Sequence, residues 1–98
     1  MADLKASLSD AAPATTLSPP LAALWWAAKG RWEEAHKIVQ DEETADAAWV
    51  HAHLHRDEGD LGNAGYWYRQ AHKPVASDRL ETEWERIVST LLQTGGRA

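Results

Sequence analysis

The residues of this chain best suited to chemistry are histidines, and three of them lie two residues apart at His51, His53 and His55. On a strand all three side chains point to one face, whereas on a helix only His51 and His55, one turn apart, share a face. Helical zinc sites take two of their ligands from residues with this spacing. If the segment is helical, it therefore directs two imidazoles to one side and leaves His53 on another.

A metal site needs at least one more ligand, and the local sequence does not identify it. The candidates by residue type are His36, Glu33, Glu58 and Asp60. One hypothesis is therefore a small helical metal-binding protein, or a metal-dependent enzyme, that holds a divalent metal with His51, His55 and His36. The alternative is that these histidines serve only to pack the fold. With five histidines in the chain, we also expect folding or assembly to depend on pH between about pH 5 and 7.

Acids and bases for catalysis are present, but none lies in a motif with a known reaction. They are Glu33, Glu34, His36, His55, Glu58, Tyr66 and Tyr68. The glycines Gly59, Gly62 and Gly65 look like a nucleotide-binding loop, yet no predicted strand precedes them, as that motif requires. The chain has no cysteine, so thiol nucleophiles and thiolate metal sites are excluded. The sequence predicts no catalytic residues, and an enzyme is not favoured.

The composition indicates one domain that binds neither nucleic acid nor a membrane. The chain has 98 residues and a formal net charge of −5, and a chain of this length builds one core rather than two. Its Lys and Arg residues are scattered, unlike those of a phosphate-binding stripe. The longest apolar run covers residues 21–28, well short of the roughly 20 residues that span a bilayer. We expect a cytoplasmic protein.

Residues 1–17 are predicted to form an N-terminal arm, and the sequence patterns that predict the main helices begin after it. In the arm, Leu4 and Leu8 favour one short helix over residues 3–9 that docks on the body. The remaining residues, 18–98, are predicted to form a single helical domain. Its expected helices cover residues 19–29, 31–40, 45–58, 61–72 and 79–94. The expected N-caps are Ser18, Thr44, Asp60 and Asp78, and Glu81 is expected to complete a capping box with Asp78. The expected C-terminal stops are Gly30, Gly59 and Gly95-Gly96. No segment alternates apolar and polar residues as a strand does, so the predicted fold class is all-α.

The first two helix pairs are related by an internal repeat with a shift of 29 residues. The shift aligns Gly30 with Gly59, Ala23 with Ala52 and Ala35 with Ala64. Small residues at matching positions let paired helices approach closely. Gly62 and Gly65 reduce helix propensity further, and we predict that they make room for a tryptophan or for the last helix.

The second copy resembles the tetratricopeptide and Sel1-like repeat families. The matching residues are Gly59-Asp60-Leu61-Gly62-Asn63-Ala64-Gly65-Tyr66-Trp67-Tyr68-Arg69-Gln70-Ala71, followed by Pro74. The resemblance covers residues 18–74 and is weaker in the first copy. It implies two repeat-like hairpins closed by a C-terminal helix. Because two repeats are fewer than such arrays normally need, either that last helix or a homodimer partner must cover an exposed face.

The same resemblance implies that the protein binds a partner protein or peptide along the face formed by the first helix of each pair. On that face the family pattern places Asp46, Trp49, His53, Arg56 and Asp57. The alternative is that these residues are the solvated side of the third helix. A large exposed indole is unusual, so Trp49 indicates an interface or a docked arm.

Six tryptophans and no phenylalanine are the most unusual feature of the composition. Alanine-rich helices leave large spaces between them, which indole rings can fill. We therefore expect a core that contains Trp25, Trp32, Trp67 and Trp84.

Overall fold

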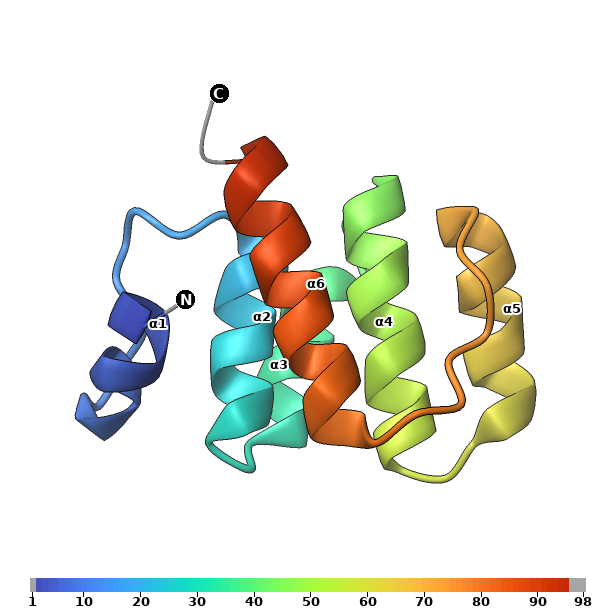
Figure 1. Cartoon of the computed structure of the whole chain (residues 1–98), viewed down its shortest axis with the longest axis horizontal. Coiled ribbons are helices and arrows are strands. Elements are labelled where there is room, and N and C mark those ends of the chain that lie inside the picture. Colours follow the sequence, from blue (N-terminus) through green and yellow to red (C-terminus); the bar gives the residue numbers. More distant parts are fainter. Residues whose placement is uncertain (1, 96–98) are drawn as a thin grey trace.

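The computed structural model describes residues 2–95, and every regular element among them is a helix (Figure 1). The elements are α1 (Ala2–Ala6), the 3-10 helix η1 (Ser7–Ser9), α2 (Pro19–Ala28), α3 (Trp32–Val39), α4 (Ala45–Asp57), α5 (Leu61–Ala71) and α6 (Leu80–Gly95). The all-α prediction is confirmed, and each expected helix is present close to its predicted bounds. Gly96, the second residue of the predicted final stop, lies outside the described residues, as do residues 97 and 98 of the predicted domain.

Short-range interactions explain where most of the helices begin and end. The Thr44 hydroxyl accepts a backbone N–H of the first turn of α4 at 3.1 Å. The Asp60 carboxylate accepts the backbone N–H of Asn63 at 3.2 Å at the start of α5. Gly30 and Gly59 have φ angles of 76° and 86°, the left-handed conformation that glycine adopts without strain. These predicted caps and stops are confirmed.

Two predicted caps differ in the structure. Ser18 precedes α2, but its side chain makes no capping hydrogen bond, and the helix starts at Pro19, whose fixed φ suits a first turn. The capping box at Asp78 is wrong, because α6 begins only at Leu80. The Asp78 carboxylate instead accepts a hydrogen bond from Nη1 of Arg86 at 2.5 Å, a side chain further along α6.

The helices form two hairpins with a closing helix laid across them (Figure 1). The first hairpin is α2 with α3 and the second is α4 with α5, while α6 packs against α4 and α2. The four alanines aligned by the repeat, Ala23, Ala35, Ala52 and Ala64, are all at most 2% exposed. Small buried side chains at these positions allow the close approach of helices that was predicted.

Gly62 and Gly65 of α5 do not make room for a neighbour, so that prediction is wrong. A Cβ added at Gly62 meets only a carboxylate oxygen of Asp60 at 3.9 Å, and one added at Gly65 meets only Nη1 of Arg69 at 3.7 Å. Both are ordinary van der Waals distances to flexible side chains. Neither glycine has a positive φ, so neither backbone conformation requires glycine.

Replacing Gly65 by alanine is therefore expected to stabilise the protein by up to about 1 kcal/mol, the difference in helix propensity between the two residues. Gly59→Ala is the matched control, because its φ of 86° makes an L-residue cost roughly 1–2 kcal/mol. Urea unfolding followed by tryptophan fluorescence measures both changes. A loss of stability in Gly65→Ala would contradict the open space seen at this position.

The tryptophans are divided between buried and partly buried positions. Trp25 is fully buried, and Trp84 is buried with its Nε1–H donating to the carbonyl of Leu24 at 2.8 Å, which confirms the core prediction for both. Trp32 and Trp67 pack against the core but are only partly buried, so the prediction holds in part for them. Trp49 was expected to be exposed but is buried. Long-range packing, which the local sequence does not encode, decides these differences.

The N-terminal arm docks on its own body. Leu4 is buried, and the hydroxyl of Ser7 accepts the Nε1–H of Trp25 at 3.0 Å. Lys29 of α2 donates to the carbonyl of Leu8 at 2.6 Å. The docking predicted from the spacing of Leu4 and Leu8 is therefore present, across a helix and the 3-10 turn that follows it.

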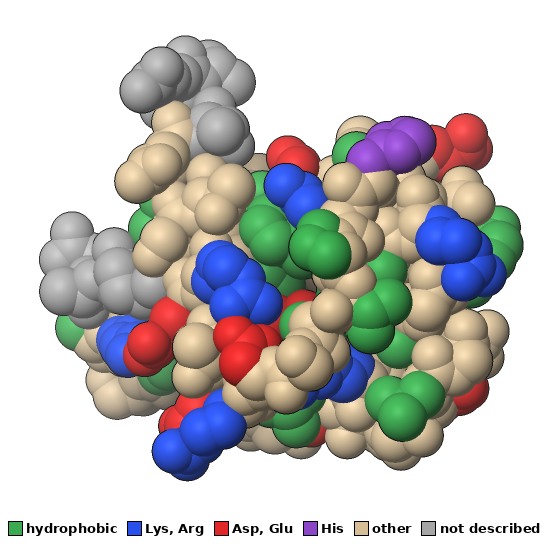
Figure 2. Space-filling view, turned by 45° about the vertical axis from the view of Figure 1, so that its right-hand side comes forward, with side chains coloured by type: hydrophobic (Ala, Val, Ile, Leu, Met, Phe, Trp, Pro, Cys, Tyr) green, Lys and Arg blue, Asp and Glu red, His purple; other side chains and the backbone are tan. Residues whose placement is uncertain are grey.

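The surface over α6 carries charges of both signs. Salt bridges pair Lys5 with Glu85, Arg79 with Glu81, and Arg86 with Asp78. Figure 2 shows basic and acidic side chains next to one another on the face that it presents. This alternation differs from the basic stripe of a nucleic-acid surface. Among residues 2–95, the helices are too short or too polar for any of them to traverse a lipid bilayer.

Candidate metal centre

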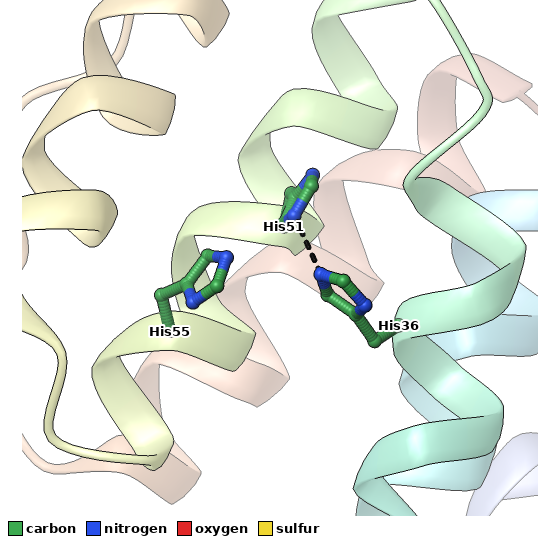
Figure 3. Close-up of side chains that lie close together, drawn as sticks. All are labelled: His36, His51 and His55. Carbon is green, nitrogen blue, oxygen red and sulfur yellow. Dashed lines mark hydrogen bonds between the residues drawn. The ribbon is translucent and has the colours of Figure 1, made fainter.

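Three histidines from two neighbouring helices converge at one point (Figure 3). His36 comes from α3, and His51 and His55 come from successive turns of α4. One ring nitrogen of each lies within 4.8 Å of a ring nitrogen of the other two. The helix places His51 and His55 on a common face, as predicted, and the packing of α3 on α4 adds His36. We refer to these three residues as the histidine cluster.

The distance between His36 and His51 fits two imidazoles bound to one metal ion. Their Nε2 atoms are 3.0 Å apart. Zinc binds imidazole nitrogen at about 2.0–2.1 Å in a tetrahedral arrangement, which places two ligand nitrogens about 3.3 Å apart. A small increase in this one distance would give the spacing of two zinc ligands. In the metal-free chain the same contact holds a single proton, because a hydrogen bond between two neutral rings uses one N–H.

Two tryptophans form the walls of the histidine cluster. Trp32 stacks on His36 with ring centroids 4.6 Å apart and an interplanar angle of 11°. Trp67 of α5 stacks on His51 at 4.0 Å and 15°. The Nε1–H of Trp32 donates to the carbonyl of Leu54 at 2.7 Å and so ties α3 to α4. Packed side chains of this kind restrict ring rotation, which reduces the entropy lost when a ligand binds.

The His51 ring has a buried nitrogen without a hydrogen-bond partner. His51 is 4% exposed, and its Nδ1 is the one fully buried side-chain nitrogen or oxygen left unpaired in the part of the chain that the structure describes. Leaving a buried polar atom unpaired costs roughly 1–3 kcal/mol. Such atoms are rare in folded proteins, and each needs a reason such as a functional role or an ion. The side chains packed around His51 therefore leave the cost of this buried nitrogen uncompensated.

Burial and repulsion from neighbouring histidines favour the neutral form of His36 and His51. Burial, followed by repulsion from His36 and His55, lowers the pKa of His51 from 6.5 to about 4. Burial and His55 also lower the pKa of His36, against the opposing effects of Glu58 and Glu33. Metal ions bind the neutral form of imidazole. At neutral pH, His36 and His51 are therefore already in the form that a metal needs.

We expect the free energy of unfolding to fall as the pH drops from about 6.5 to about 4. His51 has a pKa of about 4 in the folded chain and 6.5 as its ordinary value, so in this range the unfolded chain takes up the proton first. The contribution of neutral His51 to the free energy of unfolding is complete above pH 6.5 and is lost as the pH falls through the folded pKa. Urea unfolding between pH 7 and pH 4 measures this, and His51→Gln is expected to reduce the slope. Equal slopes in the wild type and the variant would contradict the prediction.

Two carboxylates lie on the outer side of His55. Nδ1 of His55 is 2.6 Å from Oε1 of Glu58. His55, Glu58 and Asp60 form a second group whose possible ligand atoms lie within 4.8 Å of one another. Asp60 is already engaged by the backbone and side-chain N–H groups of Asn63. Of the candidate third ligands, His36 joins the cluster, Glu58 and Asp60 flank His55, and Glu33 belongs to neither group.

The residues expected on a partner-binding face do not share an exposed surface. Asp46 and Asp57 are exposed, Trp49 and His53 are 6% and 5% exposed, and the side chain of Arg56 is 14% exposed. The closing helix α6 and the loop before it lie over this side of α4, where Arg56 donates to the carbonyl of Asp78. The expectation of an open face is therefore wrong for Trp49, His53 and Arg56. Partner binding itself stays a prediction.

The same side of α4 contains a buried carboxylate that is absent from the predicted site residues. Glu83 of α6 is fully buried and accepts hydrogen bonds from Nδ1 of His53 at 2.7 Å, from Arg56 at 3.0 Å and from the Tyr68 hydroxyl. Burial raises the pKa of Glu83, but the interactions with His53, Tyr68 and Arg56 together outweigh it and hold the pKa below its ordinary value. A signal was present, because Glu83 lies four residues before Ile87 on the apolar face of its helix.

A scan against protein-family models, a search of curated proteins and a search of solved structures each found no match to this chain. The resemblance to tetratricopeptide and Sel1-like repeats is thus neither supported nor contradicted, and it stays a prediction. What the chain does must be argued from the geometry of its own residues.

Proposed function

We propose that this protein binds a divalent transition-metal ion, with Zn²⁺ as the simplest case, through the imidazoles of His36, His51 and His55. The observation that carries the proposal is the convergence of three ring nitrogens within 4.8 Å. The contact of 3.0 Å between the Nε2 atoms of His36 and His51 supports it. Imidazole nitrogens suit zinc, copper, nickel and iron, whereas magnesium and calcium prefer oxygen ligands.

The ligand set leaves one position of a tetrahedron for water or a substrate. No fourth His, Asp or Glu among residues 4–93, whose side chains the structure describes, joins the histidine cluster, and the chain has no cysteine. Structural zinc sites normally have four protein ligands, whereas catalytic sites have three and keep one position open. The proposed site is therefore of the open type.

Adding zinc to the metal-free protein is expected to raise its melting temperature. At a free zinc concentration one hundred times Kd, the stabilisation is about 2.7 kcal/mol, which for a chain of this size corresponds to roughly 10 °C or more. His36→Gln, His51→Gln and His55→Gln are each expected to remove most of this shift. The matched control is His72→Asn, at an exposed histidine outside the cluster whose φ of 58° asparagine tolerates.

Metal analysis of dialysed protein complements the melting curves. Circular dichroism of each variant separates the loss of a ligand from the loss of the fold. If zinc, nickel and iron all leave the melting temperature unchanged, or if all three cluster variants retain as much metal as the wild type, the proposal fails. A shift lost in His72→Asn but kept in the cluster variants would contradict it as well.

A further inference from the structure

We infer that Glu58 is a positioning residue for the histidine cluster: its carboxylate holds the Nδ1–H of His55 and so leaves the Nε2 lone pair of that ring for the metal. The inference rests on the proposed metal-binding function and adds the residue that prepares one ligand before an ion arrives. Oε1 of Glu58 lies 2.6 Å from Nδ1 of His55, whose side chain is 11% exposed.

The carboxylate decides which nitrogen of His55 carries the proton. An ionised carboxylate only accepts hydrogen bonds, so the N–H of this contact belongs to Nδ1. In the neutral ring Nε2 then carries a lone pair. Figure 3 shows one ring nitrogen of His55 on the side of His51 and His36. Because Nδ1 is taken by Glu58, the nitrogen on that side is Nε2, in the form that binds a metal.

The other two histidines have no equivalent preparation. His36 and His51 share a proton between Nε2 atoms that are 3.0 Å apart, and an ion must displace it. A neutral His51 that binds the ion through Nε2 carries its proton on Nδ1, for which the described residues provide no partner. Outer residues that hold the second nitrogen of a ligating histidine normally fix its orientation and raise its basicity. Among the described residues, such a partner is present for His55 alone of the three, and it is Glu58.

The charge of Glu58 also reaches the rest of the cluster. Burial and His55 lower the pKa of His36, and Glu58 and Glu33 act against them. An electric field that favours a proton on His36 also favours a dication at the same place. Glu33 shares this long-range effect but makes no contact with His55 among the hydrogen bonds of the described residues. Glu33 is therefore the control that separates charge from hydrogen bonding.

The turn after α4 places Glu58 where it can act. Its backbone N–H donates to the carbonyl of Leu54 at 3.1 Å and extends the helical path one residue beyond the end of α4. The side chain is thereby brought one turn from His55. Gly59, with a φ of 86°, then reverses the chain, and Asp60 starts α5. The tight link between the two helices fixes the position of Glu58.

Two measurements on the full chain test the inference. Nitrogen-15 NMR of the metal-free protein at pH 7.5 reports which nitrogen of His55 is protonated, and competition with a chelating dye reports the Kd for zinc. Glu58→Ala is expected to lose the Nδ1–H form and to weaken zinc binding roughly 10- to 100-fold. Glu58→Gln, whose amide oxygen can accept the same bond, is expected to keep that form and to weaken binding less. Glu33→Gln is expected to keep the form and to change Kd only slightly.

Two outcomes overturn the inference. The first is Glu58→Ala with both the Nδ1–H form and the wild-type zinc affinity retained. The second is Glu58→Gln that keeps the Nδ1–H form yet binds zinc as weakly as Glu58→Ala, since charge alone would then explain the loss. If the wild type binds no zinc, the proposed function fails, but NMR of the metal-free wild type and Glu58→Ala still decides whether Glu58 positions His55.

Discussion

Replacing Glu83 by leucine is expected to lower the free energy of unfolding by about 3–5 kcal/mol, the range for breaking a buried ion pair from one side. Glu83 is fully buried and accepts hydrogen bonds from His53, Arg56 and Tyr68. Leucine is of similar size, but it leaves these three donors in α4 and α5 without their common acceptor. Since small domains are stable by only about 5–15 kcal/mol, the variant is expected to be close to unfolding at room temperature.

Urea unfolding at pH 7 measures this change, with circular dichroism confirming the starting fold. Glu81→Gln is the matched control, because its carboxylate lies on the same helix but is exposed, so a change within about 0.5 kcal/mol is expected. Glu83→Gln is expected to fall between the two, since the amide still accepts hydrogen bonds without the charge. If Glu83→Leu is as stable as the wild type, the hydrogen bonds to Glu83 only offset the cost of burying it.

Acid should affect the same network in a predictable direction. Burial raises the pKa of Glu83, and the hydrogen bonds from His53 and Tyr68 lower it. The net effect holds this pKa below its ordinary value of 4.5. The stabilisation is therefore complete above pH 4.5 and is lost as the pH falls through the lowered folded pKa. This pH range lies below the one in which protonation of His51 lowers the stability. In an acid titration, stability is therefore expected to be lost first through His51 and then through Glu83.

Replacing Trp25 by alanine is expected to cost about 3–5 kcal/mol, the usual range for removing a large aromatic ring from a core. Trp25 is fully buried and packs edge to face on Trp26, with ring centroids 5.1 Å apart. Its Nε1–H is also the donor to Ser7 that holds the N-terminal arm. The variant is therefore expected to lose both core stability and the docking of the arm.

Urea unfolding gives the stability of this variant, and limited proteolysis reports the arm. Ser7→Ala removes the hydrogen bond but keeps the indole, so a loss of only about 0.5–1.5 kcal/mol is expected. Both variants are expected to be cleaved faster than the wild type between the arm and α2. Unchanged cleavage in Trp25→Ala would mean that Leu4, which is buried independently, is sufficient to hold the arm.

The segment with three histidines shows how one helix supplies two different sites. Residues two apart on a helix point to nearly opposite sides, whereas residues four apart share one side. Accordingly His51 and His55 face α3 and α5, where Trp32 and Trp67 surround them, and His53 faces α6 and Glu83. A substitution at His53 is thus expected to act on stability, and one at His51 on the proposed metal site.

The sequence by itself determined the features that depend on neighbours a few residues apart. The stops at Gly30 and Gly59, the caps at Thr44 and Asp60, and the common face of His51 and His55 all follow from local backbone geometry. These signals are short-range, so they could be predicted without knowledge of the other helices. The same holds for the pairing of helices into two hairpins, since short links leave little choice.

Only the tertiary structure decided which side chains meet across helices. His36 reaches His51 over 15 residues of chain, and Glu83 reaches His53 over 30. The burial of Trp49 and His53 under α6 and the partial exposure of Trp32 and Trp67 were decided in the same way. Each depends on how far one helix is rotated about its axis against another. That rotation minimises the energy of the whole packed core at once, so no local stretch of sequence contains it.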